Sequence, residues 1–268
     1  MKQVSLLQSR ALRRTPLAIA MAVVCASASA ALPQFTLDPA GANPVLLGTL
    51  FTADNIVISD YSHVVINGSS GAFSDTGFLA VQGFQLASAA ITAPGLNSTY
   101  GLYFQFSGTG TQTLGNPFTS SNSGTFSTLN YTLYGYNGPA ATFGFDSSNN
   151  PTTTAAGAFA LATGSLVFGT VNTQPTGTGF TPGAFAQLTF NPVPSEAGFF
   201  AAPGSFYTTA FAAFTNTPNQ VRIVSPTEFV ISQGGGVINF ASQVPEPQSY
   251  ALMLGGLLAV GFVKRRRS

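Results

Sequence analysis

The sequence predicts an all-β protein that folds as a single antiparallel β-sandwich or jelly roll. Between residues 32 and 243, short runs of β-branched and aromatic residues alternate with Gly, Ser, Thr, Asn and Pro, which is typical of strands joined by turns. No run in this region keeps a helical period over ten residues or more. The 24 Phe and 8 Tyr supply enough apolar surface for a core packed with aromatic rings, so disorder is a poor interpretation.

Two segments give the clearest strand pattern. Residues 101–107 place Leu102, Phe104 and Phe106 on one face, and residues 128–136 alternate in the same way, as half-buried strands of an antiparallel sheet do. With these two, about ten or eleven strands are expected, which favours a sandwich or jelly roll. The other predicted strands are residues 55–66, 78–91, 141–145, 164–171, 184–190, 206–214, 220–224, 228–232 and 237–241.

Two further predictions concern the segments between strands. Residues 107–127 and 147–157 are low in complexity and predict long mobile loops. Gln233 is followed by three glycines without the Lys-Ser/Thr of a phosphate-binding loop. These glycines predict a tight turn between two strands.

Charge is distributed very unevenly along the chain. Only 6% of the residues are charged, against about 25% in a typical globular domain. Eight of the nine bases lie at the two ends, and they are Lys2, Arg10, Arg13, Arg14, Lys264, Arg265, Arg266 and Arg267. Between residues 31 and 243 there are one basic residue, Arg222, and seven acidic residues, which gives a net charge of −6. A region with a single base has no patch that could neutralise phosphates, so nucleic-acid binding is excluded.

Residues 1–30 predict a secretory signal peptide. A basic stretch precedes an apolar run and then a series of small residues, which is the order found in such signals. Ala28 and Ala30 form an A-x-A site, so signal peptidase is expected to cleave before Ala31. Cys25 would be removed with the signal, which leaves the exported chain, residues 31–243, without cysteine.

Residues 244–268 form the second targeting segment. The motif Val244-Pro245-Glu246-Pro247 is followed by an apolar run over residues 250–263 and then by the basic tail Lys264-Arg265-Arg266-Arg267. As a helix the apolar run would measure about 21 Å at about 1.5 Å per residue, which is short for a hydrocarbon core of about 30 Å. It predicts a short transmembrane helix that anchors the precursor, with the basic tail in the cytoplasm. The two prolines keep the motif extended and accessible to a peptidase.

This three-part segment resembles the PEP-CTERM sorting signal of Gram-negative bacteria. The resemblance implies that an exosortase, a membrane-embedded cysteine protease, recognises and processes the chain at the Pro-Glu-Pro motif. It also implies a final location at the cell surface or in the extracellular matrix of a bacterium that makes exopolysaccharide.

Short blocks in the rest of the chain resemble the flocculation-associated PEP-CTERM proteins of the PepA type. The blocks are residues 35–39, 51–56, 60–62, 102–106, 213–221 and 234–240. This resemblance implies a protein without catalytic residues that retains extracellular polysaccharide, joins cells, and so promotes floc or biofilm formation.

Residues suited to catalysis are few. His63 is the single histidine, no Gly-x-Ser-x-Gly motif accompanies it, and zinc would lack His and Cys ligands. The acid–base pair of a glycoside hydrolase could come from five carboxylates: Asp54, Asp60, Asp75, Glu196 and Glu228. No sequence motif identifies any two of them as that pair. We therefore predict no catalytic residue, no metal site and no cofactor.

Three groups of side chains leave alternatives open. Asp54 and Asp75 could contribute to a calcium site formed by loops, although no EF-hand or repeat motif accompanies them. Arg222 is expected to pair with an acid such as Glu228. The third group is an aromatic series, Tyr131, Tyr134 and Tyr136. It either forms an exposed binding strip or shields the sheet at its solvent face.

The surface expected from this composition is rich in hydroxyl, amide and aromatic groups and poor in charge. Such groups contact neutral or acidic polysaccharide by hydrogen bonds and ring stacking, and a net charge of −6 would favour bridging to acidic glycans by divalent cations. Two other functions stay open. One is a lectin-like module with a concave aromatic site, and the other is an enzyme acting on matrix glycans through two facing carboxylates.

Overall fold

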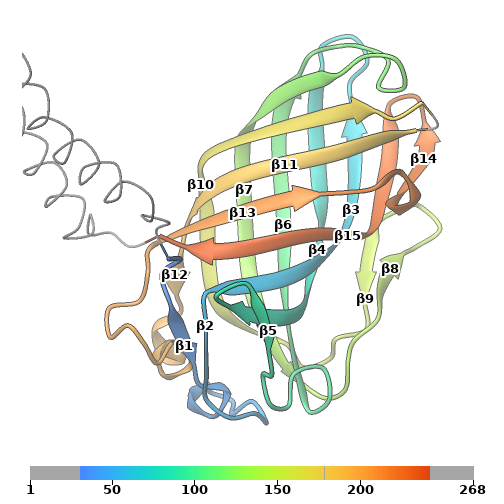
Figure 1. Cartoon of the computed structure of the whole chain (residues 1–268). Helices are drawn as coiled ribbons and strands as arrows, with labels where there is room; N and C mark the ends of the chain where they lie inside the picture. The colour runs from blue at the N-terminus through green and yellow to red at the C-terminus, as the bar shows by residue number, and fades with distance from the viewer. Residues whose placement is uncertain (1–30, 178, 242–268) are drawn as a thin grey trace, which may run out of the picture. The chain divides into compact units, whose positions relative to one another are not determined.

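The computed structural model describes residues 31–177 and 179–241. Within them, eight strands form a closed antiparallel barrel (Figure 1). Their order around the wall is β10 (Phe159–Pro175), β11 (Phe180–Thr189), β13 (Thr209–Thr215), β15 (Glu228–Phe240), β3 (Asn55–Ile66), β4 (Ala72–Leu86), β6 (Tyr100–Gln112) and β7 (Asn122–Asn137). β7 pairs with β10, which also pairs with β11, and this closes the ring.

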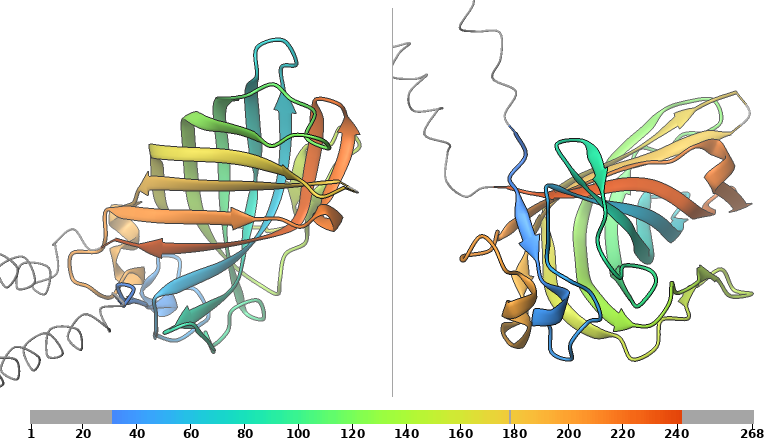
Figure 2. Two further views of the ribbon diagram at one scale, coloured as in Figure 1. Left: turned by 45° about the horizontal axis from the view of Figure 1, so that its top comes forward. Right: turned by 60° about the horizontal axis from the view of Figure 1, so that its bottom comes forward.

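Shorter elements are attached to the ring. β1 (Phe35–Leu37) pairs with β2 (Phe51–Ala53), and β8 (Phe143–Phe145) pairs with β9 (Pro151–Thr153). The additional strands β5 (Ala89–Ile91), β12 (Asn191–Pro192) and β14 (Val221–Ser225) pair with β4, β10 and β15 respectively. Three 3-10 helices are described, η1 (Pro39–Gly41), η2 (Pro194–Phe199) and η3 (Pro218–Gln220). Two further views show the curvature of the wall (Figure 2).

The all-β prediction is confirmed, but the sandwich or jelly roll is wrong. A sandwich consists of two packed sheets, whereas here a single sheet curls until β10 and β11 meet along its seam. Register shifts occur in five of the ring's strand pairs. Such bulges bend and twist strands, and this curvature lets one sheet close on itself.

The loop predicted over residues 107–127 is mostly strand. β6 continues to Gln112 and β7 begins at Asn122, so only residues 113–121 connect them. Gly108 and Gly110 lie close to the rings of Phe126 and Phe73, so glycine stands where the alternation would otherwise show large apolar side chains. Of the second predicted loop, residues 147–157, Pro151–Thr153 form strand β9.

The turn predicted at the glycine run is also wrong. β15 continues through it, and its register with β3 shifts between Ser232 and Gly234. Gln233 has a φ of 58°, in the left-handed region, so the chain forms a bulge here without reversing. Gly234 lies so close to Asn216 that a Cβ atom would collide with the Asn216 Oδ1 atom, which explains the need for glycine.

One end of the barrel is filled by rings that we call the aromatic plug: Phe35, Phe190, Phe200, Phe206 and Phe240. The ring centroid of Phe240 lies 4.8 Å from that of Phe190 and 5.0 Å from that of Phe35, with nearly perpendicular planes. Edge-to-face packing of this kind is favourable for aromatic rings. The prediction of an aromatic core is therefore confirmed.

The described part of the chain contains no helix that has both the length and the apolar character needed to cross a membrane. The predicted signal peptide, residues 1–30, and the predicted sorting segment, residues 244–268, lie outside the described residues.

The aromatic plug predicts a large loss of stability for Phe190→Ala. Phe190 is 1% exposed and its ring contacts three other plug rings, so the free energy of unfolding should fall by about 3 to 5 kcal/mol. Phe185→Ala is the matched control, because this ring on β11 is 39% exposed and should cost less than about 1.5 kcal/mol. Urea unfolding followed by circular dichroism measures both, and equal losses would contradict a tightly packed plug.

Candidate functional site

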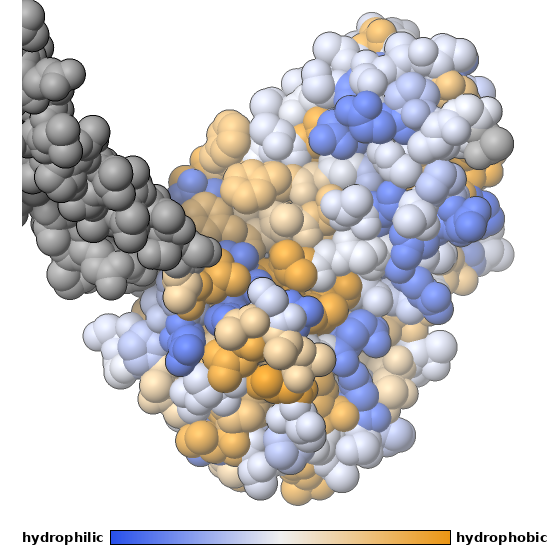
Figure 3. All heavy atoms as spheres, viewed as in Figure 1, coloured by the Kyte–Doolittle hydropathy of each residue, from blue (hydrophilic) through white to orange (hydrophobic). Residues whose placement is uncertain are grey.

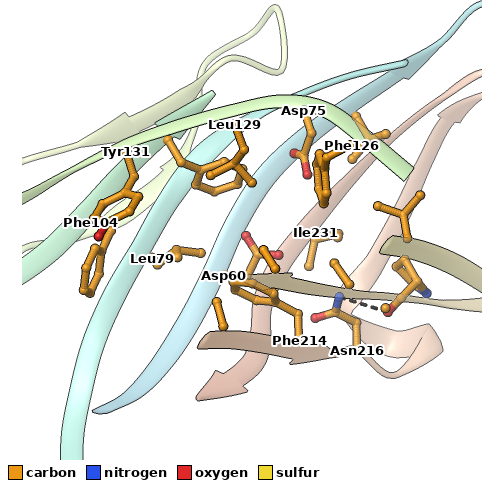
Figure 4. A pocket seen from close by; sticks show the side chains of 18 of the residues that line it. Asp60, Asp75, Leu79, Phe104, Phe126, Leu129, Tyr131, Phe214, Asn216 and Ile231 are labelled. Atoms are coloured by element: carbon orange, nitrogen blue, oxygen red, sulfur yellow. Dashed lines mark hydrogen bonds between the residues drawn. The ribbon is translucent and has the colours of Figure 1, made fainter. Parts of the chain in front are cut away.

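A mainly apolar cavity of about 90 Å³ lies inside the barrel. All eight wall strands contribute to its lining, because every second residue of a strand in a barrel points inward. Most of the lining consists of aromatic rings and aliphatic side chains, among them Leu79, Phe104, Phe126, Leu129 and Phe214 (Figure 4).

Among the polar side chains of this lining, we call four the polar cluster: Asp60 on β3, Asp75 on β4, Thr173 on β10 and Asn216 after β13. Each has one side-chain oxygen that is shielded from solvent and has no hydrogen-bond partner. Asp60, Thr173 and Asn216 are at most 5% exposed. Figure 4 shows Asp60, Asp75 and Asn216 directed into the same space. Each such oxygen costs about 1 to 3 kcal/mol when it stays unpaired.

The bulge in β15 helps to position two members of the polar cluster. Gly234 lies against both the Oδ1 atom of Asn216 and the Cβ atom of Asp60. The Nδ2 atom of Asn216 donates a hydrogen bond to the carbonyl oxygen of Pro182 at 3.1 Å. This bond fixes the orientation of the amide and leaves its oxygen free beside Asp60.

Burial changes the acidity of both carboxyl groups in the cavity. It raises the pKa of Asp60 from an ordinary value near 4 to about 7. The pKa of Asp75 is raised well above its usual range, first by burial and second by the negative charge of Asp60. None of the described residues that line the cavity is Lys, Arg or His, so neither carboxylate has a cationic neighbour there.

A second cavity, of about 260 Å³, adjoins the first at the end opposite the aromatic plug. Gln112, Thr173 and Phe229 line both cavities. The connection between β6 and β7 and the β14–β15 hairpin form the rim of the second cavity, and three exposed apolar side chains stand on that rim: Leu114, Phe118 and Ile223. The interior of the barrel therefore continues to a largely apolar mouth.

The outer surface of β4, β6, β7 and β10 carries a continuous set of uncharged polar side chains, which we call the polar face. Strand register places its members in rows across the wall. The rows are Ser74, Thr109 and Thr128; Thr76, Ser107, Asn130 and Ser165; and Gln105, Thr132 and Thr163. All of these except half-buried Thr132 are exposed, so this side of the barrel offers hydroxyl and amide groups without a charge.

A different surface covers the strands on the near side of Figure 3. There apolar side chains gather over the middle of the barrel wall. Val167, Phe168 and Phe185, which lie on β10 and β11, are 55%, 52% and 39% exposed. The wall is thus polar and uncharged on one side and partly apolar on another.

The aromatic series splits between the two sides of the wall. Tyr131 points into the barrel, where its hydroxyl donates a hydrogen bond to the carbonyl oxygen of Thr189 at 2.8 Å. Tyr136 is buried and Tyr134 half-buried on the outside, where the segment that contains Phe143 packs over them. The shielding interpretation is confirmed for these two, and the exposed strip is wrong.

The sequence predicts that Arg222 pairs with an acid such as Glu228, but Glu228 pairs with His63. The Nε2 atom of His63 lies 2.9 Å from the Oε1 atom of Glu228. Arg222 donates instead to the Oδ1 atom of Asn149 at 2.8 Å, and the Nδ2 atom of Asn149 donates to Glu228 at 3.2 Å. The direct Arg222–Glu228 pair is therefore wrong, because the hairpin residue Asn149 lies between the two side chains.

The remaining carboxylates have local structural roles. Asp54 accepts a hydrogen bond from the backbone N–H of Ala87 at 2.6 Å, and Glu196 accepts one from the backbone N–H of Asn43 at 2.7 Å. Asp54 and Asp75 lie toward opposite ends of the β3–β4 pair, so they do not share a calcium site. Among the described residues, no group of three or more metal-ligating side chains comes together.

The polar cluster was only partly visible in the sequence. Asp60 and Asp75 stood among the five carboxylates considered, but Thr173 and Asn216 were missed. A signal did exist for Asp60, since it occupies an inward position of the alternating series that includes Ile58 and Val64. A carboxylate in an otherwise apolar series indicates either a buried partner or a site.

Of the residues predicted to take part in cleavage by signal peptidase and exosortase, the structure describes one, Ala31. Ala31, the first residue after the predicted cleavage, is described and exposed. Ala28 and Ala30, the Val244-Pro245-Glu246-Pro247 motif and the basic tail Lys264-Arg265-Arg266-Arg267 lie outside the described residues.

The raised pKa of Asp60 predicts that stability falls as the pH rises. The unfolded carboxyl releases its proton near pH 4, whereas the folded one keeps it to about pH 7. The stabilisation from this group is therefore complete below pH 4 and is lost as the pH rises through 7.

Asp60→Asn should remove part of this pH dependence. The variant should become more stable than the wild type by about 1 to 3 kcal/mol at pH 8, with a smaller difference at pH 5. Asp146→Asn is the contrast, because hydrogen bonds from Asn150 lower the pKa of this exposed group. Thermal unfolding between pH 4 and 8 measures the effect, and a constant difference between wild type and Asp60→Asn would refute it.

Comparison of the chain with protein-family models, curated proteins and solved structures finds no match. The features that bear on its function are therefore the cavity with its polar cluster inside the barrel and the polar face outside it.

Proposed function

We propose that this protein is an exported, non-catalytic component of the bacterial cell surface or extracellular matrix. In this proposal it retains exopolysaccharide and joins cells, and so promotes the formation of flocs or biofilm. The structural observation that supports the proposal is the polar face, which spreads hydroxyl and amide groups over four adjacent strands.

The chemistry of the polar face suits a polysaccharide partner. Hydroxyl and amide groups both donate and accept hydrogen bonds, as sugar hydroxyls do. Strand spacing of about 4.8 Å repeats these groups across the wall, and a repeating polymer can contact several of them at once. The face itself adds no negative charge, so an acidic polymer would not be repelled locally.

The route to the cell surface is argued from the two ends of the sequence. The segment over residues 1–30 would direct export and cleavage by signal peptidase. The segment over residues 244–268 would anchor the precursor in the membrane until an exosortase processes it. The proposed location is thus the surface or the surrounding matrix of a Gram-negative bacterium.

The two alternative functions have less support. A lectin-like site at the tyrosines would need accessible rings, but Tyr136 is buried and Tyr134 is half-buried beneath the segment that contains Phe143. A glycan-acting enzyme would be favoured by the two carboxylates in one cavity, Asp60 and Asp75. However, the aromatic plug fills one end of the barrel, so a polymer chain could not pass through to reach both sides of that pair.

The proposal predicts that the gene is needed for cell aggregation and that the polar face is needed for the protein to act. Deletion should abolish flocculation while polysaccharide synthesis continues. The wild-type gene should restore flocculation, whereas a variant with Ser107→Glu and Asn130→Glu should restore it poorly, because two charges would interrupt the central row of the face.

The matched control carries Ala213→Glu and Thr215→Glu. Both of these residues are exposed on β13, which lies four strands from β6 around the wall, so this variant adds the same charge elsewhere. Flocculation is measured by sedimentation, and affinity electrophoresis measures retention of the purified polysaccharide. Normal flocculation of the deletion strain, or equal behaviour of the two variants, would overturn the proposal.

A further inference from the structure

The interior of the barrel has three properties of a built binding site. Its walls are paired strands on every side, the aromatic plug fills one end, and the adjoining cavity of about 260 Å³ leads to the other end. Small-molecule sites in proteins are typically concave and mainly apolar with a few well-placed polar groups. The cavity of about 90 Å³ with its polar cluster has this composition.

The unpaired atoms of the polar cluster define what kind of group would satisfy them. An amide oxygen and an ionised carboxylate only accept hydrogen bonds. Asp60 is ionised above its pKa of about 7, and Asp60, Asp75 and Asn216 each leave an oxygen without a partner. The amide of Asn216 cannot turn its N–H groups inward without losing its bond to Pro182. A complementary group must therefore donate several hydrogen bonds.

The charge of the site defines the group further. The two bases described within the barrel domain have partners of their own, since His63 contacts Glu228 and Arg222 contacts Asn149. Asp60 and Asp75 are the titratable groups that face the polar part of the cavity, together with the Tyr131 hydroxyl, which is bonded to Thr189. An ammonium group would supply both the missing positive charge and three N–H donors.

The apolar lining of the cavity and its mouth defines the other end of the ligand. Rings and aliphatic side chains surround the polar cluster, and the mouth carries exposed Leu114, Phe118 and Ile223. An unbranched hydrocarbon chain would cover these groups while its polar end lies at the carboxylates.

We propose that the barrel interior binds a primary amine with an apolar chain, its ammonium group beside Asp60, Asp75 and Asn216 and its chain extending through the second cavity toward the mouth. This site is separate from the polar face, so it does not depend on the proposed function. Loss of one activity would leave the other intact.

The first test uses the wild-type exported chain and three probes with the same hydrocarbon chain. Isothermal titration calorimetry at pH 8, below the micelle concentrations, should show saturable binding of decylamine. Decan-1-ol and decanoic acid should bind at least tenfold more weakly, since one lacks the charge and the other carries the wrong charge. Decylamine binding should weaken as the pH falls from 8 to 5, because Asp60, whose pKa is about 7, becomes protonated. Absence of decylamine binding, or equal binding of the alcohol, would overturn the proposal.

The second test places the site. Asp60→Asn should weaken decylamine binding tenfold or more without loss of the fold, because the amide has nearly the same shape as the carboxyl group. Asp146→Asn, on the exposed β8–β9 hairpin, is the matched control and should bind as the wild type does. Both variants are checked for folding by circular dichroism. Unchanged binding by folded Asp60→Asn would show that the amine binds elsewhere and would refute the site.

Discussion

The pairing of β10 with β11 is the constraint on which the other features depend. It runs from Leu166 opposite Leu188 to Pro175 opposite Phe180, and it joins the two ends of what would otherwise be an open sheet. Once the seam is closed, every inward side chain of the eight strands is enclosed. The aromatic plug then excludes water from one end, and carboxyl groups that would be ordinary on an open sheet become buried.

The barrel wall separates two kinds of polar chemistry. Inside, the polar cluster contains acceptor atoms without partners and two carboxyl groups that hold their protons to unusually high pH. Outside, the polar face presents neutral hydroxyl and amide groups in rows. The inner groups suit one small ligand with a defined charge, and the outer groups suit an extended polymer. The small number of charged residues is consistent with both the polar cluster and the polar face, because neither contains an ion pair.

The sequence allowed the strand class to be predicted but not the closure. Period-two alternation depends only on which side of a strand is buried, so it is the same in a sandwich and in a barrel. The ends of β6 and β7 were missed because glycine occupies inward positions there, and the middle of β15 was missed because a glycine bulge looks like a turn. The site was half visible, in Asp60 and Asp75. Thr173 and Asn216 approach them only through strand pairings between residues distant in the sequence.

Amide hydrogen exchange along β10 and β11 tests the closed barrel most directly. If the seam is formed, the amides of β11 that face β10 should exchange as slowly as those of the β4–β6 pair, which is internal to the sheet. If the sheet were open between β10 and β11, that edge of β11 would be exposed, and those amides would exchange within the first seconds of labelling. Slow exchange throughout β10 and β11 is the result expected for the barrel, and fast exchange along that shared edge would contradict it.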